Sequence, residues 1–142
     1  MIDRYQLRTA CERLFRRTGG STDRSAPFAE LPAAMQAHIQ NVVAFVEPEL
    51  PIVASFSSND SWVVATTDRV VFRTGESVTA IPLAHLREVH SLLLEDGNTS
   101  RDDVIVLTTD TQRYEISVER GYALSGLWNV LRRLCRAWAA NA

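Results

Sequence analysis

The sequence predicts a mainly β domain with helices at both ends: seven short strands in an antiparallel barrel or sandwich, two N-terminal helices and a C-terminal capping helix. Three observations predict this class. Apolar residues recur at helical spacing up to residue 46. From residue 50 to 118 the period shortens to that of strands, with turn residues between the runs. A strongly amphipathic segment then ends the chain. The length of 142 residues fits one domain.

Two helices are expected before the strands. The first covers residues 3–17 and ends at Gly19-Gly20. Residues 21–28 are polar enough to predict a loop. The second helix begins at Pro32, a residue suited to a first helical turn, and its apolar stripe continues to Val46. The two stripes are Leu7, Ala10, Cys11, Leu14 and Phe15, then Met35, His38, Ile39, Val42, Val43 and Val46.

Seven runs of β-branched and aromatic residues predict the strands. Thr74-Gly75-Glu76 and Asp110-Thr111 are typical hairpin turns, and residues 83–86 suggest one short helical turn. The even spacing of the runs favours antiparallel pairing between neighbours. The expected strands are residues 50–56, 62–67, 69–73, 77–82, 88–95, 104–109 and 113–118.

The last element is the most regular. Its apolar residues follow the spacing of one helical face, and its polar residues occupy the other side. A stripe of this width must be buried, so the helix is expected to cap the sheets. The apolar face holds Leu124, Leu127, Trp128, Leu131, Leu134, Cys135 and Trp138, and the polar face Ser125, Asn129, Arg132, Arg133 and Arg136.

A stretch in the middle of the chain resembles the bacterial pleckstrin-homology-like family, which includes GRAM-type domains. In Trp62–Phe72 an apolar strand is followed by Thr, an Asp-Arg pair and a second apolar strand, and Ile81-Pro82-Leu83 and Leu86-Arg87-Glu88-Val89 are similar to the next segments. The resemblance implies a bent barrel with one open end plugged by the final helix. We therefore divide the chain into residues 1–46, an N-terminal helical extension packed on the domain, and residues 47–142, the barrel with its helix.

Charge is distributed unevenly along the chain. All fifteen basic residues are arginine. Residues 1–24 carry a net charge of +3, residues 25–119 carry −9 and residues 120–142 carry +4. Arginines interrupt the N-terminal segment that a secretion signal would need, and the longest apolar run, residues 42–46, is too short to span a bilayer. Together with two cysteines expected as free thiols on apolar stripes, these features predict a cytoplasmic protein, and the family resemblance implies a bacterial one.

The sequence offers no recognisable catalytic motif. No nucleophile elbow, phosphate-binding loop or paired Cys-x-x-Cys occurs. His85 and His90 flank Glu88 near a predicted strand, but further metal ligands are missing, so isolated histidines are the better interpretation. We expect no enzyme activity, no metal and no cofactor.

Anionic ligands receive mixed support. In phosphoinositide-binding relatives, cations cluster on the first two strands and their loop, whereas Ser55–Trp62 holds no cation and one acid, which argues against such lipids. Trp128 and Trp138 lie on the buried stripe, away from the arginines, which argues against nucleic acid. Recruitment to an anionic membrane through the basic helices remains the alternative function.

The candidate partner-binding residues are Glu95, Asp96, Asp102 and Asp103, in an acidic loop between two strands. Such a loop is either a mobile solvated segment or a surface complementary to a basic protein. The leading hypothesis is a non-enzymatic protein-binding module. It would be either an immunity protein that neutralises a basic toxin or an adaptor in a larger assembly.

Overall fold

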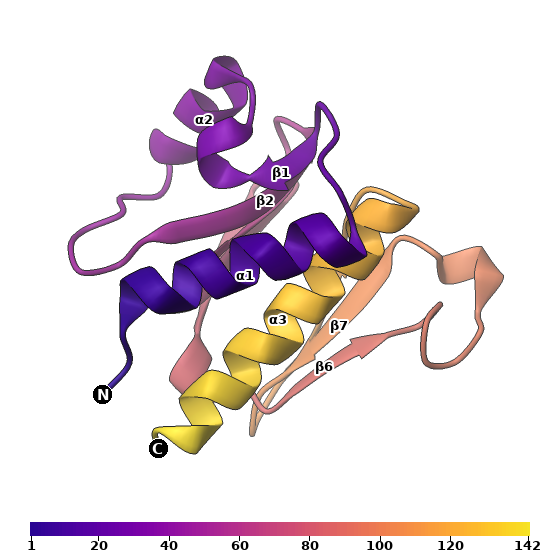
Figure 1. The fold of residues 1–142 in the computed structure, drawn as a ribbon. Coiled ribbons are helices and arrows are strands. Elements are labelled where there is room, and N and C mark those ends of the chain that lie inside the picture. Colours follow the sequence, from indigo (N-terminus) through magenta and orange to yellow (C-terminus); the bar gives the residue numbers. More distant parts are fainter.

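The computed structural model describes all residues, 1–142, as three helices and two antiparallel sheets (Figure 1). The larger sheet has the order β1-β2-β3-β4-β5, and the smaller one β6-β7-β8. The helices are α1 (Arg4–Thr18), α2 (Ala33–Gln40) and α3 (Tyr122–Ala140), with short 3-10 turns η1 (Phe28–Glu30), η2 (Leu83–His85) and η3 (Thr99–Arg101). The strands are β1 (Ser25–Pro27), β2 (Pro51–Ser58), β3 (Ser61–Thr66), β4 (Arg69–Thr74), β5 (Ser77–Pro82), β6 (Glu88–Ser91), β7 (Val104–Thr108) and β8 (Arg113–Ser117).

The expected class is confirmed in its main lines: antiparallel sheets, two N-terminal helices and a C-terminal helix. Two details of the prediction are wrong. The sheets do not close into a barrel, because β5 and β8 are both unpaired edges, and there are eight strands instead of seven. No helix is both long and apolar enough to cross a membrane.

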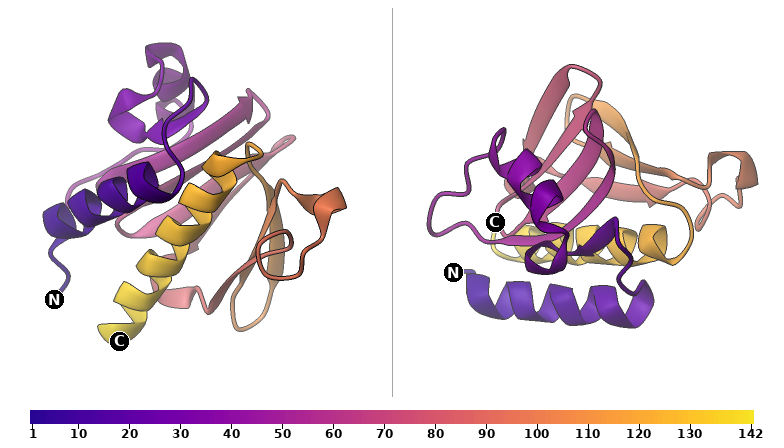
Figure 2. Two further views of the ribbon diagram at one scale, coloured as in Figure 1. Left: turned by 45° about the vertical axis from the view of Figure 1, so that its right-hand side comes forward. Right: turned by 90° about the horizontal axis from the view of Figure 1, so that it is seen from above.

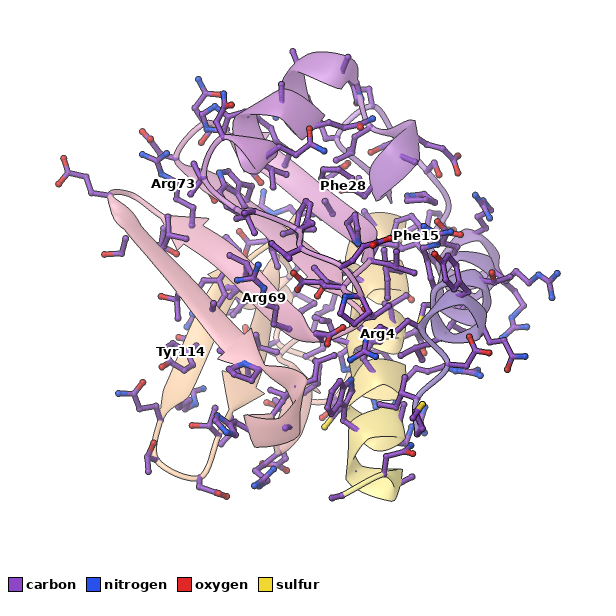
Figure 3. The ribbon with its side chains drawn as sticks, turned by 90° about the vertical axis from the view of Figure 1, so that its left-hand side faces the viewer. Arg4, Phe15, Phe28, Arg69, Arg73 and Tyr114 are labelled. Atoms are coloured by element: carbon purple, nitrogen blue, oxygen red, sulfur yellow. The ribbon has the colours of Figure 1, made fainter.

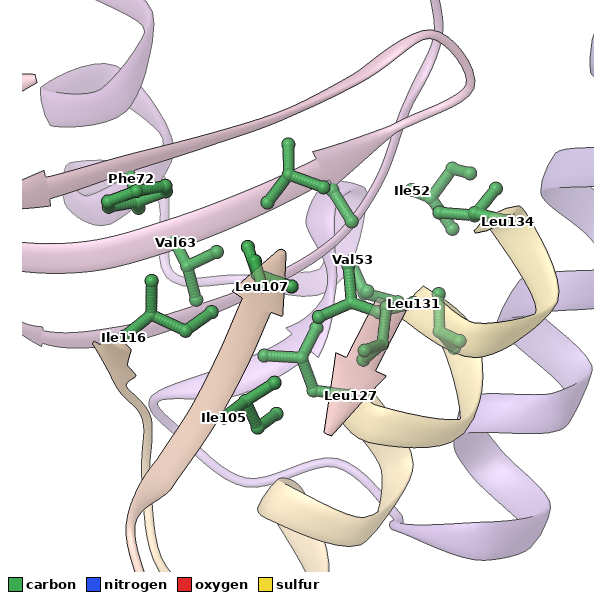
Figure 4. Packing of buried hydrophobic residues seen from close by; sticks show 14 of the residues in the cluster. Ile52, Val53, Val63, Phe72, Ile105, Leu107, Ile116, Leu127, Leu131 and Leu134 are labelled. Carbon is green, nitrogen blue, oxygen red and sulfur yellow. The ribbon is translucent and has the colours of Figure 1, made fainter. Parts of the chain in front are cut away.

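The main core lies between the two sheets and α3. The expected stripe of α3 is buried: Leu127, Leu131 and Leu134 are at most 1% exposed. Figure 4 shows these three leucines facing side chains of both sheets, among them Val53 and Ile105. A second, smaller core lies between the outer face of the five-stranded sheet and the α2 region, around Phe28, Ile39, Phe56 and Trp62. The helix α3 therefore caps the sheets, as its pattern predicts.

The helix α1 lies against α3, in a layer outside the sheets (Figures 1 and 2). The helix begins at Asp3, whose carboxylate accepts the N–H of Gln6 at 3.1 Å, and ends at Gly19. Asp3 caps the helix through this side-chain hydrogen bond, and Gly20, the residue after Gly19, has the positive φ of 83° that favours glycine beyond a helix end. Leu7, Cys11 and Phe15 form its buried face.

The expected loop at residues 21–28 is wrong, because Ser25–Pro27 forms the strand β1. Its residues pair with Ser55, Ala54 and Val53 of β2, and all three are buried. Polar side chains hold the strand in place: the Ser25 hydroxyl bonds the Ser55 hydroxyl at 2.9 Å and Glu119 at 3.0 Å, and Thr22 also bonds Glu119. The strand thus depends on partners far away in the sequence.

Two other elements are shorter than predicted. The helix α2 ends at Gln40 rather than at residue 46, and Val42 and Val46 are exposed. The following segment extends along the sheet, where the Arg69 guanidinium bonds the Ala44 carbonyl at 2.9 Å. The strand β6 ends at Ser91, because the Ser91 hydroxyl and carbonyl accept backbone N–H groups from residues 94 and 95 and close a turn.

Candidate functional site

The turn between β3 and β4 contains the residues that carry the family resemblance. Asp68 receives two hydrogen bonds from the Arg4 guanidinium, at 2.9 and 2.8 Å, and one from the Thr67 hydroxyl at 2.6 Å. Beside it, Arg69 contacts Glu49 at 2.8 and 3.1 Å. The Trp138 indole N–H donates to the Thr67 carbonyl at 2.8 Å. Figure 3 shows Arg4 and Arg69 near each other at this turn.

These contacts make the β3–β4 turn a junction that joins α1, the start of β2 and the end of α3. The bonds from Arg4 and Thr67, with the positive charge of Arg4 and Arg69, hold the pKa of Asp68 below its ordinary value. The same pair raises the pKa of Arg4. Both side chains are about a quarter exposed. Since each charged group at the turn has its partner within the chain, we assign the junction a structural role.

The loop between β2 and β3, which holds no basic residue of its own, is contacted by basic residues from other segments. Arg24 donates to the Ser57 carbonyl at 3.0 Å, and Arg73 contacts the Asp60 carboxylate at 3.1 Å. The ring of His38 lies 2.9 Å from the Asn59 carbonyl. The sequence does not show these neighbours, because they come from the residue before β1, from β4 and from α2. Each is engaged with the loop itself, so the expected lack of phosphoinositide binding stays a prediction.

The acidic loop is anchored at its start. His90, at the end of β6, has its two ring nitrogens against two different carboxylates: Nδ1 contacts Glu95, and Nε2 lies 2.8 Å from Asp96. The hydrogen bond that the ring donates to Asp96, together with the charge of both acids, raises the pKa of His90. Glu95 also accepts the indole N–H of Trp128 in α3 at 3.2 Å. The loop is therefore tied to both a strand and a helix.

The other two acids lie at the far end of the loop. Asp102 forms an ion pair with Arg120 at 2.8 Å, and the Asp103 carbonyl accepts the Val118 N–H. Of the four acids of the loop, only Asp103 has a carboxylate without a basic partner within the chain. The structure brings Glu95 and Asp96 together around His90 but gives them no contact with Asp102 or Asp103. A partner role for these four residues stays a prediction.

His85 and His90, the two histidines considered as metal ligands, lie in different parts of the structure. His85 is exposed in η2 and lines a surface pocket, whereas His90 is held by the acidic loop. No group of three or more His, Cys, Asp or Glu side chains has a metal-binding arrangement. Both cysteines are free thiols, Cys11 buried and Cys135 half-buried. Burial raises the pKa of Cys11 to about 12, against the opposing charge of Arg133.

The main basic feature is formed by α1 and α3 together. Eight arginines lie on these two helices, and the only acid on either is Glu12. Arg4 and Arg16 are paired, with Asp68 and Glu30. The others have no carboxylate within ion-pair distance, and we call them the arginine layer: Arg8, Arg13, Arg17, Arg132, Arg133 and Arg136.

Two glycines, one at the end of α1 and one in α3, let the two helices of this layer pack closely. A Cβ atom placed on Gly19 would lie 2.7 Å from the Cα of Gly126, and one on Gly126 would lie 2.8 Å from the Phe15 ring. Without side chains at these two positions, the end of α1 rests directly on the start of α3. The sequence shows two basic ends, but only this contact places them in one layer. Figure 2 shows the two helices side by side from above.

Two aromatic rings lie beside arginines of the layer, so the expectation that Trp128 lies away from the arginines is wrong. The Arg132 guanidinium lies 4.5 Å from the centre of the Trp128 ring, and that of Arg8 lies 5.6 Å from the centre of the Tyr5 ring. Tyr5 is 63% exposed. Arg8 itself is half-buried, and Tyr and Arg are among the residue types enriched at the energetic centres of protein interfaces.

Comparison of the chain with family models, with curated proteins and with solved structures gave no match in any of the three.

Proposed function

We propose that this chain is a non-enzymatic protein-binding module of the bacterial cytoplasm, and that its arginine layer binds an acidic surface of a protein partner. The observation that carries the proposal is the contrast in pairing: six arginines of α1 and α3 lack carboxylates, whereas three of the four acids in the predicted loop have basic partners. Unpaired cations are free to attract an opposite charge and to set the rate and specificity of encounter.

The proposal keeps both versions of a binding module, an immunity protein and an adaptor. It changes the surface that carries the main charge contact from the acidic loop to the arginine layer. The family resemblance of residues 47–140 supports a binding role, since it implies a scaffold used for recognition. We propose a pleckstrin-homology-like fold whose five-stranded sheet includes the additional strand β1.

The alternative function is recruitment to an anionic membrane by the same arginines. A helix that lies in a membrane interface buries its apolar face among the lipids. Here the apolar faces of α1 and α3 are buried inside the protein. Membrane binding would therefore rest on charge alone and would be strongly screened by salt.

The test compares two variants with the same loss of charge. The layer variant carries Arg13→Gln, Arg17→Gln, Arg133→Gln and Arg136→Gln. The control carries Arg24→Gln, Arg87→Gln, Arg101→Gln and Arg113→Gln, which lie outside the two helices. We expect affinity purification from the native cell to yield a partner with the wild type and the control, but not with the layer variant. Binding must then be reproduced with the purified partner, and it should weaken as salt rises.

Two arms of the same experiment discriminate the alternatives. Vesicles of phosphatidylserine and phosphatidylcholine test the membrane: binding that needs the four layer arginines would replace the protein partner by a lipid surface. A variant with Gln or Asn at Glu95, Asp96, Asp102 and Asp103 tests the acidic loop. If this variant loses the partner and the layer variant keeps it, the contact surface is the loop, as the sequence alone predicts.

A further inference from the structure

The four sheet edges differ in how they are protected. Exposed strand edges carry unpaired backbone groups that other strands can join, and proteins block them with charge, proline, shortness or cover. The edge β1 has three buried residues and ends in Pro27, and the edge β6 is short and lies beside α3. The edge β8 carries Arg113 and Glu115. β5 also ends in a proline, Pro82, but it is longer than β1 and pairs in unbroken register over six residues without one charge.

The outward backbone groups of β5 follow from its pairing with β4. The Leu83 N–H bonds the Asp68 carbonyl at 2.9 Å, so residues 83 and 68 face each other across the ladder. Bonding alternates along an antiparallel pair, which turns the backbone groups of Ser77, Thr79 and Ile81 toward β4. The N–H and C=O groups of Val78 and Ala80 therefore point away from the sheet. Pro82 adds an outward carbonyl.

The two ends of β5 are an exposed turn and an open pocket. Before it, the turn at Gly75 and Glu76 has open space around Gly75 and is exposed. After it, an open pocket of about 370 Å³ lies between β5 and the β7–β8 hairpin, lined by Ala80, Ile81, Pro82, His85, Thr109, Asp110, Thr111, Gln112 and Tyr114. Tyr114, labelled in Figure 3, belongs to β8. Its ring packs edge-on against the ring of Phe72 in β4, with 5.7 Å between the ring centres.

We propose that β5 is a dimerisation edge and that its partner is β5 of a second copy of this chain. A two-fold axis at Thr79 pairs Val78 of each copy with Ala80 of the other, so that all four outward N–H groups find a carbonyl. The same axis places the Gly75–Glu76 turn of one copy beside the pocket of the other. Contacts related in this way close on themselves and stop at two copies.

Charge and composition fit a second copy. The strand places no like charges against each other across the axis, because it has none. Glu76 has no basic partner within its own chain, and His85, in the pocket, has no acidic one. The two-fold axis brings Glu76 of one copy near His85 of the other. Val78, which is 44% exposed in the single chain, becomes covered.

Sedimentation equilibrium over a concentration series tests the proposal, with the purified chain itself as the probe. We expect the wild type to show the mass of two chains. The dissociation constant of the Ala80→Pro dimer should be roughly tenfold higher or more, because each copy loses an N–H donor at the axis. The substitution removes an N–H that β4 does not use, so the fold tolerates it. Ala80→Ser keeps the N–H and is the matched control.

Two further measurements make the result decisive. If circular dichroism shows that Ala80→Pro is unfolded, Val78→Lys replaces it, since a lysine on the edge repels its two-fold mate. Hydrogen exchange should protect the amides of Val78 and Ala80 only at dimer concentrations, and those of Thr79 and Ile81 at all concentrations. A monomeric wild type would overturn the proposal, as would a dimer that Ala80→Pro and Val78→Lys leave unchanged.

Discussion

The acidic loop and the arginine layer are both charged surface regions, but their charges have different surroundings. In the loop, Glu95 and Asp96 share His90, and Asp102 faces Arg120. In the layer, six arginines lie on two packed helices whose only acid is Glu12. A cation or anion that is paired within the chain mainly orders the fold, while an unpaired one is available to a partner. Net charge along the sequence, −9 in the middle and positive at the ends, does not reveal this difference.

The largest expected effect comes from separating the two helices that form the layer. Gly126→Ala puts a methyl group 2.8 Å from the Phe15 ring and 2.9 Å from the Cα of Gly19. We expect a loss of about 1–3 kcal/mol in the free energy of unfolding, as is usual for overpacking. Chemical denaturation measures the loss. Ser125→Ala, the adjacent position on α3, is the control and should change stability little.

The same variant sharpens the comparison of the two regions. Gly126→Ala should weaken partner binding if the layer acts as one surface, while the ion pairs of the acidic loop stay in place. If its stability matches that of Ser125→Ala, the close approach of α1 and α3 contributes nothing, and the layer would not depend on it.

An intermediate effect distinguishes paired from unpaired arginines. Arg4→Gln breaks the bidentate contact with Asp68 and should cost about 1 kcal/mol, since both side chains are only partly screened by water. Arg13→Gln removes an exposed arginine without a partner and should change stability by less than about 0.5 kcal/mol. Equal unfolding free energies for the two variants would remove the distinction on which the comparison rests.

The difference in stability between the wild type and Arg4→Gln should depend on pH. The pKa of Asp68 is lowered in the folded protein, so its contact with Arg4 stabilises the fold above the ordinary value of 3.8 and is lost as the pH falls through the lowered value. The gap between the wild type and Arg4→Gln should therefore be full at neutral pH and close in acid. Unfolding curves from neutral pH down to the acid range measure it.

The smallest effect concerns the acidic loop. The raised pKa of His90 means that its imidazolium, with one carboxylate at each nitrogen, stabilises the loop below the ordinary value of 6.5. That contribution is lost as the pH rises through the raised value. A nuclear magnetic resonance titration of His90 should show its midpoint above 6.5 and a lower midpoint in Asp96→Asn. A wild-type midpoint at or below 6.5 would mean that the carboxylates do not hold the ring.

The elements that the sequence predicts well are those whose pattern is local. The stripe from Leu124 to Trp138 specifies α3, because one helical face must be buried wherever the helix lies. The hairpins around Gly75 and around Asp110-Thr111 follow from turn residues between β-branched runs. In contrast, Ser25–Pro27 is too short and too polar to show a period. It is a strand because β2 offers its edge and because Ser55 and Glu119 bond its first residue.

The sequence predicts the surroundings of the charged residues less well, because these too depend on residues far apart in the chain. The partner of Asp102 is 18 positions away, at Arg120, and the indole that bonds Glu95 is 33 positions away. Composition identifies the loop as acidic but carries no information on such distant pairs. The sequence shows that both ends of the chain are rich in arginine. That the two ends form one layer depends on the contact between Gly19 and Gly126, which a count of charges does not reveal.

The packing of α1 on α3 has a consequence for how the chain is made. Synthesis proceeds from the N-terminus, so α1 leaves the ribosome well before α3, the helix against which it buries its apolar face. Leu7, Cys11 and Phe15 must wait for more than a hundred further residues before their final neighbours exist, and β1 must wait for Glu119. During that interval the apolar face of α1 lacks the helix that covers most of it, and exposed apolar surface of this kind makes a chain depend on chaperones.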